Sequence, residues 1–197
     1  KWIAKMIEEH PNMDFVGGGE ESFGFMVGDF VRDKDAVTST LLACEIAALT
    51  KANGSSFFNA LIDLYTIHGL FKERLVSIIK KGKTGAQKIQ KLMDEARTSP
   101  PIKINGSSVI KIDDYQSSIS QNTTTSTASD INIPKANVLI FTTEDGSRIA
   151  LRPSGTEPKI KYYISVNKTL KIASEFESVE LELEAKINEI LKAMNLE

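Results

Sequence analysis

Apolar and polar positions along the chain predict helices and strands in both halves. Apolar residues recur at helical spacing in 2–9, 36–51, 57–69, 85–97 and 175–196. Apolar and polar residues alternate as in a strand in 74–81, 102–112, 138–142, 149–152 and 160–166. A short apolar run at 13–16 also predicts a buried strand. This order predicts an α/β domain followed by an α+β domain, in which a small antiparallel sheet packs against the C-terminal helix.

Two prolines directly after a predicted helix mark the clearest break in the chain. Pro100 and Pro101 follow Thr98 and Ser99, so we expect one domain over 1–98 and another over 99–197. Within the second domain, 117–130 is polar and biased toward serine and threonine. That composition predicts a mobile loop at about 117–130 rather than part of the core.

Composition narrows the classes of function. The chain of 197 residues has a formal net charge of −2, so it lacks the basic excess with which proteins bind nucleic acid. Cys44 is the one cysteine, which excludes a disulfide framework and predicts a small core residue. No apolar run approaches the length of a membrane span. The chain begins inside an apolar periodic pattern, which indicates the middle of a longer protein.

The run Arg-Pro-Ser-Gly-Thr-Glu-Pro-Lys-Ile-Lys at 152–161 predicts a tight loop between two strands. Arg152 offers a planar fork of donors, Ser154 and Thr156 offer hydroxyls, and Gly155 lets a ligand approach the backbone. Lys161 adds a charge if the strand folds back. These groups suit a phosphate. By residue type alone, the run is also compatible with a hairpin turn that carries an incidental arginine.

A second candidate site is the run Gly-Glu-Glu-Ser-Phe-Gly at 19–24. Carboxylates and hydroxyls bind the vicinal hydroxyls of a sugar, and alternation on an extended segment lets Glu20 and Ser22 face one ligand. A surface turn with solvated glutamates is the alternative. Arg32 and Lys34 follow, and Asp35 is a plausible N-cap of the next helix. This charged run could also be a solvated helix entrance.

Both runs resemble motifs of the α-D-phosphohexomutases, the family of phosphoglucomutase and phosphomannomutase. The run at 152–161 resembles their phosphate-binding loop, which implies phosphate contacts for Arg152, Ser154, Gly155, Thr156 and Lys161. Family members often have arginine in place of Lys161, so its role is the least secure of these. The run at 19–24 resembles their sugar-binding loop, which implies that Glu20 and Ser22 bind sugar hydroxyls. The resemblance further implies that Arg32 meets the phosphosugar and that Lys34 is a candidate catalytic residue, through electrostatic help or proton transfer.

The resemblance covers most of the third and all of the fourth of the family's four domains. It implies a cytoplasmic isomerase that interconverts hexose 1-phosphate and hexose 6-phosphate through a sugar 1,6-bisphosphate. The family's phosphorylated serine and magnesium-binding loop belong to earlier domains, and we find neither motif nor a metal site in this chain. Mg²⁺ and the bisphosphate are therefore expected only in the full-length enzyme, and this fragment alone is expected to be inactive. The alternative is a stand-alone, non-catalytic module that binds phosphosugars.

Overall fold

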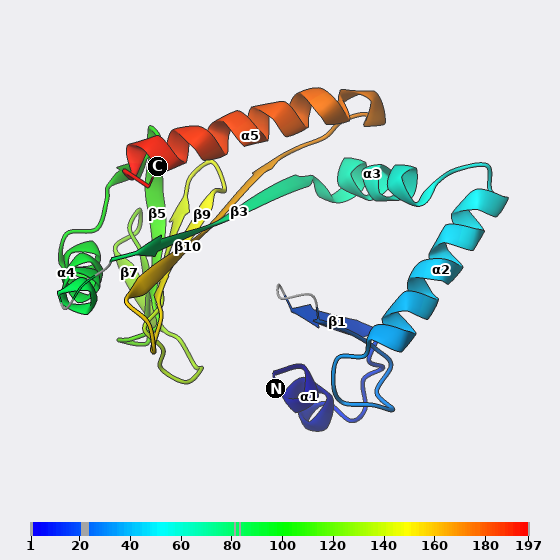
Figure 1. Ribbon diagram of the computed structural model, residues 1–197, viewed down its shortest axis with the longest axis horizontal. Helices are drawn as coiled ribbons and strands as arrows, with labels where there is room; N and C mark the ends of the chain where they lie inside the picture. Colours follow the sequence, from blue (N-terminus) through cyan, green and yellow to red (C-terminus); the bar gives the residue numbers. More distant parts are fainter. Residues whose placement is uncertain (1, 21–23, 81, 83, 197) are drawn as a thin grey trace. The chain divides into compact units, whose positions relative to one another are not determined.

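The computed structural model describes residues 2–20, 24–80, 82 and 84–196 (Figure 1). The chain forms two compact units, which comprise residues 1–63 and 64–197. The described elements of the first unit are helices and a short hairpin, and those of the second are a large antiparallel sheet and helices. The α/β-then-α+β order expected from the sequence is confirmed.

The first unit comprises two helices, a hairpin and the start of a third helix. The elements are α1 (Trp2–Glu9), β1 (Gly17–Glu20), β2 (Gly24–Val27), α2 (Ala36–Ala52) and α3 (Phe57–His68), which continues into the second unit. β1 and β2 pair antiparallel, and Glu20 lies opposite Gly24. Asp35 caps α2 as expected, because its carboxylate accepts hydrogen bonds from the backbone N–H groups of Val37 and Thr38.

Two expectations for the first unit are wrong. The strand expected at 13–16 begins instead at Gly17, because the Met13 N–H donates to the His10 carbonyl in a turn and Val16 is 88% exposed. Cys44 is exposed and not a core residue. No residue of α2 is buried against the rest of the described chain.

The second unit consists of one antiparallel sheet and the helices around it. Its strands are β3 (Leu70–Ile79), β4 (Lys103–Ile104), β5 (Ser107–Asp114), β6 (Ile119–Asn122), β7 (Thr127–Asp130), β8 (Leu139–Thr143), β9 (Arg148–Pro153) and β10 (Lys159–Lys168). They run in the order β3-β10-β9-β8-β5-β6-β7, and β4 pairs with β5. Its helices are α4 (Gly85–Thr98), the short η1 (Ala173–Glu175) and α5 (Phe176–Ala193).

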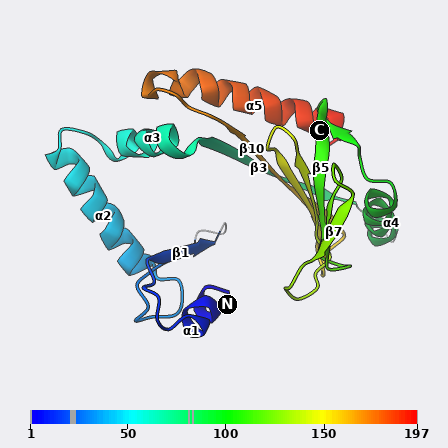
Figure 2. The ribbon, with the colours of Figure 1, turned by 180° about the vertical axis from the view of Figure 1, so that it is seen from behind.

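One face of this sheet is covered by α5 (Figure 1, Figure 2). Alternate residues of β10 are buried, among them Ile160, Ile164 and Val166. Leu183 and Ile187 are the most deeply buried residues in the middle of α5. The period of two in the strand and the helical period in α5 therefore supply the two sides of one core.

The division between the units differs from the predicted boundary at 98/99. β3 pairs with β10 from Leu70 opposite Lys168 to Ile79 opposite Lys159, so 70–79 is part of the C-terminal sheet. α4 also belongs to the second unit, where its Ile89 and Met93 are buried. Pro100 and Pro101 thus follow α4 inside the second unit. The division between the units falls between Asp63 and Leu64 in the sequence.

The loop expected at 117–130 is a β-hairpin. β6 pairs with β7 from Ile119 opposite Asp130 to Asn122 opposite Thr127. The Asn122 side chain accepts from the N–H groups of Thr124 and Thr125 and closes the turn. No residue of β6 or β7 is buried, so the hairpin has no apolar face. Its polar composition is therefore the same as that of a loop, which is why the sequence predicted one.

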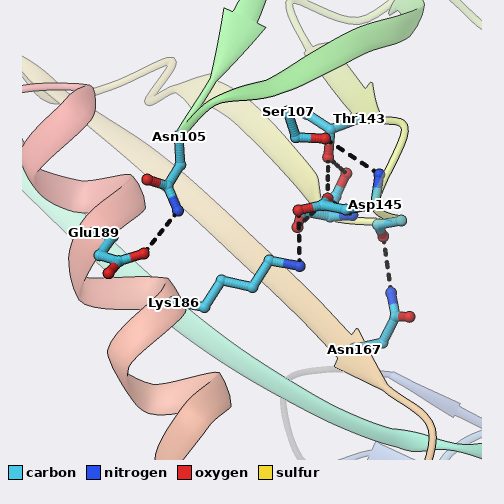
Figure 3. A network of polar contacts seen from close by, with 9 residues as sticks. Asn105, Ser107, Thr143, Asp145, Asn167, Lys186 and Glu189 are labelled. Carbon is cyan, nitrogen blue, oxygen red and sulfur yellow. Dashed lines mark hydrogen bonds and ion pairs between the residues drawn. The ribbon is translucent and has the colours of Figure 1, made fainter.

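A polar network ties the β8–β9 turn to α5 (Figure 3). Asp145 Oδ1 accepts from Thr143 Oγ1 at 2.7 Å, Ser147 N at 3.1 Å and Ser147 Oγ at 2.8 Å, and Lys186 Nζ of α5 lies 3.0 Å from Oδ2. Burial of this carboxyl opposes ionisation, but the hydrogen bonds from Thr143, Lys186 and Ser147 outweigh it. They hold the pKa of Asp145 well below its usual range.

Candidate functional site

The connection between β9 and β10 forms a concave surface. It is lined by Arg152, Pro153, Ser154, Gly155, Thr156, Glu157, Lys159 and Lys161. The sequence predicted a phosphate-binding loop in this segment. The five residues predicted to contact phosphate all line the surface: Arg152, Ser154, Gly155, Thr156 and Lys161. We call residues 152–161 the phosphate loop.

Ser154 shapes this loop through its own oxygen. Its Oγ accepts from the N–H groups of Thr156, at 3.4 Å, and Glu157, at 3.3 Å. The Ser154 N–H donates in turn to the Lys159 carbonyl at 2.9 Å. A serine hydroxyl can accept and donate at once, and both contacts use it as the acceptor. Its hydrogen is therefore available to a ligand.

Arg152 and Lys161 are direct cross-strand partners. Like charges directly opposite each other destabilise a sheet. Within the described chain, neither side chain forms a close ion pair: the nearby Glu157 carboxylate pairs with Lys159 and interacts with the charge of Lys161 only at longer range. An anion placed between Arg152 and Lys161 would relieve this repulsion. The pair is therefore suited to hold a phosphate.

Gly155 has no packing reason to be glycine. A Cβ atom built on it would meet no heavy atom within 4 Å, and its φ lies outside the left-handed range. Gly155 lines the same concave surface as Arg152 and Lys161. The missing side chain thus leaves room for a ligand to approach the backbone.

A second cluster lies in the first unit, around the end of the β1–β2 hairpin. A pocket there is lined by Ile3, Ala4, Glu20, Met26, Arg32, Asp33 and Lys34. Lys34 Nζ is 3.1 Å from Asp33 Oδ1 and 3.7 Å from Glu20 Oε2, and Arg32 pairs with Glu8 of α1. The hydrogen bond and charge of Asp33 raise the pKa of Lys34, and the charge of Glu20 adds to this. Of the predicted sugar site, Ser22 lies outside the described residues.

Gly24 determines where Lys34 lies. A Cβ atom on Gly24 would overlap Cδ of Lys34 and come within 2.8 Å of its Cγ. The aliphatic part of Lys34 therefore passes over Gly24, the cross-strand partner of Glu20, where there is no side chain in its way. Gly24 was part of the predicted motif at 19–24 but had no predicted role, because its residue type does not reveal that Lys34 lies against it.

We expect Gly24→Ala to displace Lys34 without unfolding the hairpin, because a lysine stem is flexible. The pKa of Lys34 should then fall toward its ordinary value, since the ammonium leaves Asp33 and Glu20. An NMR pH titration of the Lys34 side chain measures this. Gly19→Ala is the matched control, because its Cβ meets the Phe25 ring and not Lys34. An unchanged Lys34 titration in Gly24→Ala would contradict the assignment.

The described residues contain no group of three or more histidine, cysteine, aspartate or glutamate side chains placed to hold a metal ion. They also contain no helix with the length and apolar character needed to cross a bilayer. The two clusters offer cations and hydroxyls for an anion, and a carboxylate with cations for a polar ligand.

Comparisons with known proteins match nearly the whole chain. Residues 1–65 match the family model described as phosphoglucomutase/phosphomannomutase, alpha/beta/alpha domain III. Residues 80–183 match the model described as the C-terminal domain of the phosphoglucomutase/phosphomannomutase family.

Among curated proteins, the phosphoglucomutase of Staphylococcus haemolyticus (strain JCSC1435) is 38% identical over 168 residues, which cover 85% of this chain and 30% of that protein. The phosphoglucomutase of Staphylococcus aureus (strain bovine RF122 / ET3-1) is 41% identical over 169 residues, or 84% of this chain and 30% of that protein. The chain thus spans about 30% of the length of these curated relatives.

Among solved structures, the open form of pp63/parafusin, a phosphoglucomutase from Paramecium, aligns with a TM-score of 0.55. The sequence identity is 18%, and the alignment covers 95% of this chain and 32% of that one. At this identity the likeness concerns the fold alone.

Proposed function

Because the chain belongs to the phosphoglucomutase and phosphomannomutase family, we propose that it is the substrate-binding, C-terminal part of a hexose-phosphate mutase. The longer protein would be a cytoplasmic enzyme that interconverts hexose 1-phosphate and hexose 6-phosphate through a sugar 1,6-bisphosphate. The observation that carries the proposal is the pair of cations, Arg152 and Lys161, directly opposite each other beside a loop whose Ser154 hydroxyl accepts hydrogen bonds from two backbone N–H groups and whose Gly155 has open space beside it.

In this proposal the phosphate loop holds the phosphate that is not reacting. Arg152 donates two parallel hydrogen bonds, which fix the orientation of the phosphate as well as its position. Ser154 and Thr156 donate from their hydroxyls, and Lys161 adds a charge. Gripping a remote group in this way orients the sugar for reaction but makes or breaks no bond.

The first-unit cluster would bind the sugar. Glu20 would accept from sugar hydroxyls, and Ser22 would share that task. Arg32 would leave Glu8 to meet the phosphosugar. Lys34, held between Asp33 and Glu20, would place a positive charge near the reacting oxygen and is our candidate for electrostatic help or proton transfer.

Phosphorylation of a serine and binding of Mg²⁺ belong to the rest of the longer protein in this proposal. The metal would neutralise charge on the transferring phosphoryl group. The described residues supply no ligand set for it. We therefore expect the 197-residue chain alone to show no mutase activity with glucose 1-phosphate, Mg²⁺ and glucose 1,6-bisphosphate, and the longer protein to be active in the same coupled assay. Turnover that scales with the purified chain would contradict this assignment of roles.

Phosphate binding by the chain itself is the direct test. In a phosphate titration followed by NMR, we expect the amide signals of Ser154, Gly155 and Thr156 to shift and saturate. Gly155→Ala should keep the unfolding temperature, because its Cβ meets nothing, and should bind phosphate more weakly, because the methyl group occupies ligand space. Saturating phosphate without any shift in a folded chain would contradict the proposed function. Phosphate binding by a longer protein that lacks mutase activity would instead favour a non-catalytic phosphosugar-binding module.

A further inference from the structure

The phosphate loop is joined to a segment far away in the sequence. β3 pairs with β10 up to Ile79, which lies opposite Lys159, and one further hydrogen bond follows. The Lys80 N–H donates to the Pro158 carbonyl at 2.9 Å. Pro158 is part of the phosphate loop, so the Lys80 peptide holds the side of the loop that returns to β10.

Gly85, the first residue of α4, lies directly against the Lys80 carbonyl. A Cβ atom on Gly85 would overlap the Lys80 carbonyl oxygen and lie 2.9 Å from its carbonyl carbon and 3.3 Å from Pro158 Cβ. These neighbours are backbone atoms and a proline ring, which cannot move aside as a flexible side chain can. Gly85 is buried, and its N–H donates to the Gly82 carbonyl at 2.9 Å.

We propose that the Lys80 backbone and Gly85 form a brace that positions the phosphate loop, so that two residues outside the lining of the concave surface influence its affinity for phosphate. The inference rests on the proposed function, because it assumes that the loop binds phosphate. Chain connectivity explains why a brace is needed. Between Pro153 and Lys159 the loop leaves the sheet and is held by contacts within it, and among the described residues the Lys80–Pro158 hydrogen bond ties it to another segment.

Gly85→Ala tests the brace. The added methyl group cannot coexist with the Lys80 carbonyl, so the Lys80 backbone must shift, and we expect that shift to weaken the hydrogen bond from the Lys80 N–H to Pro158. We expect the affinity of the 197-residue chain for inorganic phosphate to fall on the order of tenfold, because small displacements of binding groups have effects of this size. The fold should persist, with exchange of the Lys80 amide hydrogen faster than in the unchanged chain.

Gly106→Ala is the matched control. Gly106 has a φ of +78°, so alanine is strained there too, but a Cβ meets nothing within 4 Å. It lies in the β4–β5 turn, whose Asn105 contacts Glu189 of α5. We expect this variant to unfold at a lower temperature and to keep its phosphate affinity. Equal losses of affinity in both variants would mean that destabilisation alone weakens binding, which would overturn the inference.

A second measurement needs no variant. If the brace and the bound loop support each other, saturating phosphate should slow exchange of the Lys80 amide hydrogen in the unchanged chain. Phosphate binding with wild-type affinity in Gly85→Ala, or without any change in Lys80 exchange, would refute the brace and leave the proposed function standing. Failure of the unchanged chain to bind phosphate would instead contradict the proposed function, and the brace with it.

Discussion

Replacing Arg152 with lysine is expected to lower the catalytic efficiency of the longer protein by ten- to a hundredfold, although the charge is retained. Lysine cannot form the two parallel hydrogen bonds of a guanidinium. A hydrogen bond to a charged group contributes roughly 1.5–3 kcal/mol, and about 1.4 kcal/mol corresponds to a factor of ten. The loss should divide between substrate binding and turnover, because the loop orients the sugar as well as holding it.

Steady-state kinetics of the longer protein and phosphate titration of the 197-residue chain measure this effect separately. Lys161→Arg is the informative comparison, because it places a second guanidinium opposite Arg152 and keeps the net charge. We expect it to retain both phosphate affinity and activity, because the positive charge stays and a guanidinium can also donate two parallel hydrogen bonds. If Arg152→Lys retained full affinity for phosphate, charge alone would account for binding and the bidentate contact would be refuted.

Asp145→Ala is expected to lower the free energy of unfolding of the second unit by about 1–3 kcal/mol. The Ser147 hydroxyl and the Lys186 ammonium each lose a partner, and Ser147 is only 2% exposed. A buried polar group without its hydrogen bond costs roughly 1–3 kcal/mol. Urea unfolding followed by circular dichroism measures the change. Glu144→Ala, at the neighbouring exposed position, should leave stability nearly unchanged.

The pH dependence of stability supplies an independent check on Asp145. Its pKa is lower in the folded chain than in the unfolded chain, so its contribution is present above the unfolded pKa of about 3.9. This stabilisation is lost as the pH falls through the folded pKa. We therefore expect Asp145→Asn to reduce the stability near neutral pH and to flatten its decline below about pH 4. An unchanged acid slope in the variant would show that other carboxyls dominate acid unfolding.

Sequence patterns predicted a helix or strand correctly where neighbouring residues alone determine it. Helical periodicity located α5, and the Asp35 cap located the start of α2. The hairpin at 119–130 escaped prediction because both of its faces are exposed, so it lacks an apolar period. The predicted domain boundary at 98/99 differs from the observed division because β3 pairs with the distant strand β10. The residues next to β3 in the sequence give no sign of that pairing.

The candidate site shows the same limit. The phosphate loop could be predicted because its donors are contiguous in the sequence, from Arg152 to Lys161. The contact of Gly24 with Lys34, and that of Gly85 with the Lys80 carbonyl, could not. In a sequence, a glycine does not reveal which distant group occupies the place of its side chain. The like-charge pairing of Arg152 with Lys161 likewise depends on the register of β9 and β10.

The pairing of β3 with β10 has a consequence for how the protein is made. Residues 70–79 leave the ribosome well before 159–168, so β3 must wait for its partner while β4 to β9 are synthesised. Contacts between such distant segments form slowly, and an unpaired strand is prone to aggregate in the meantime. β3 carries Phe71, Leu75 and Ile79 on the side that stays exposed even after folding. Synthesis rate and chaperone supply should therefore govern its soluble yield more than the stability of the finished sheet does.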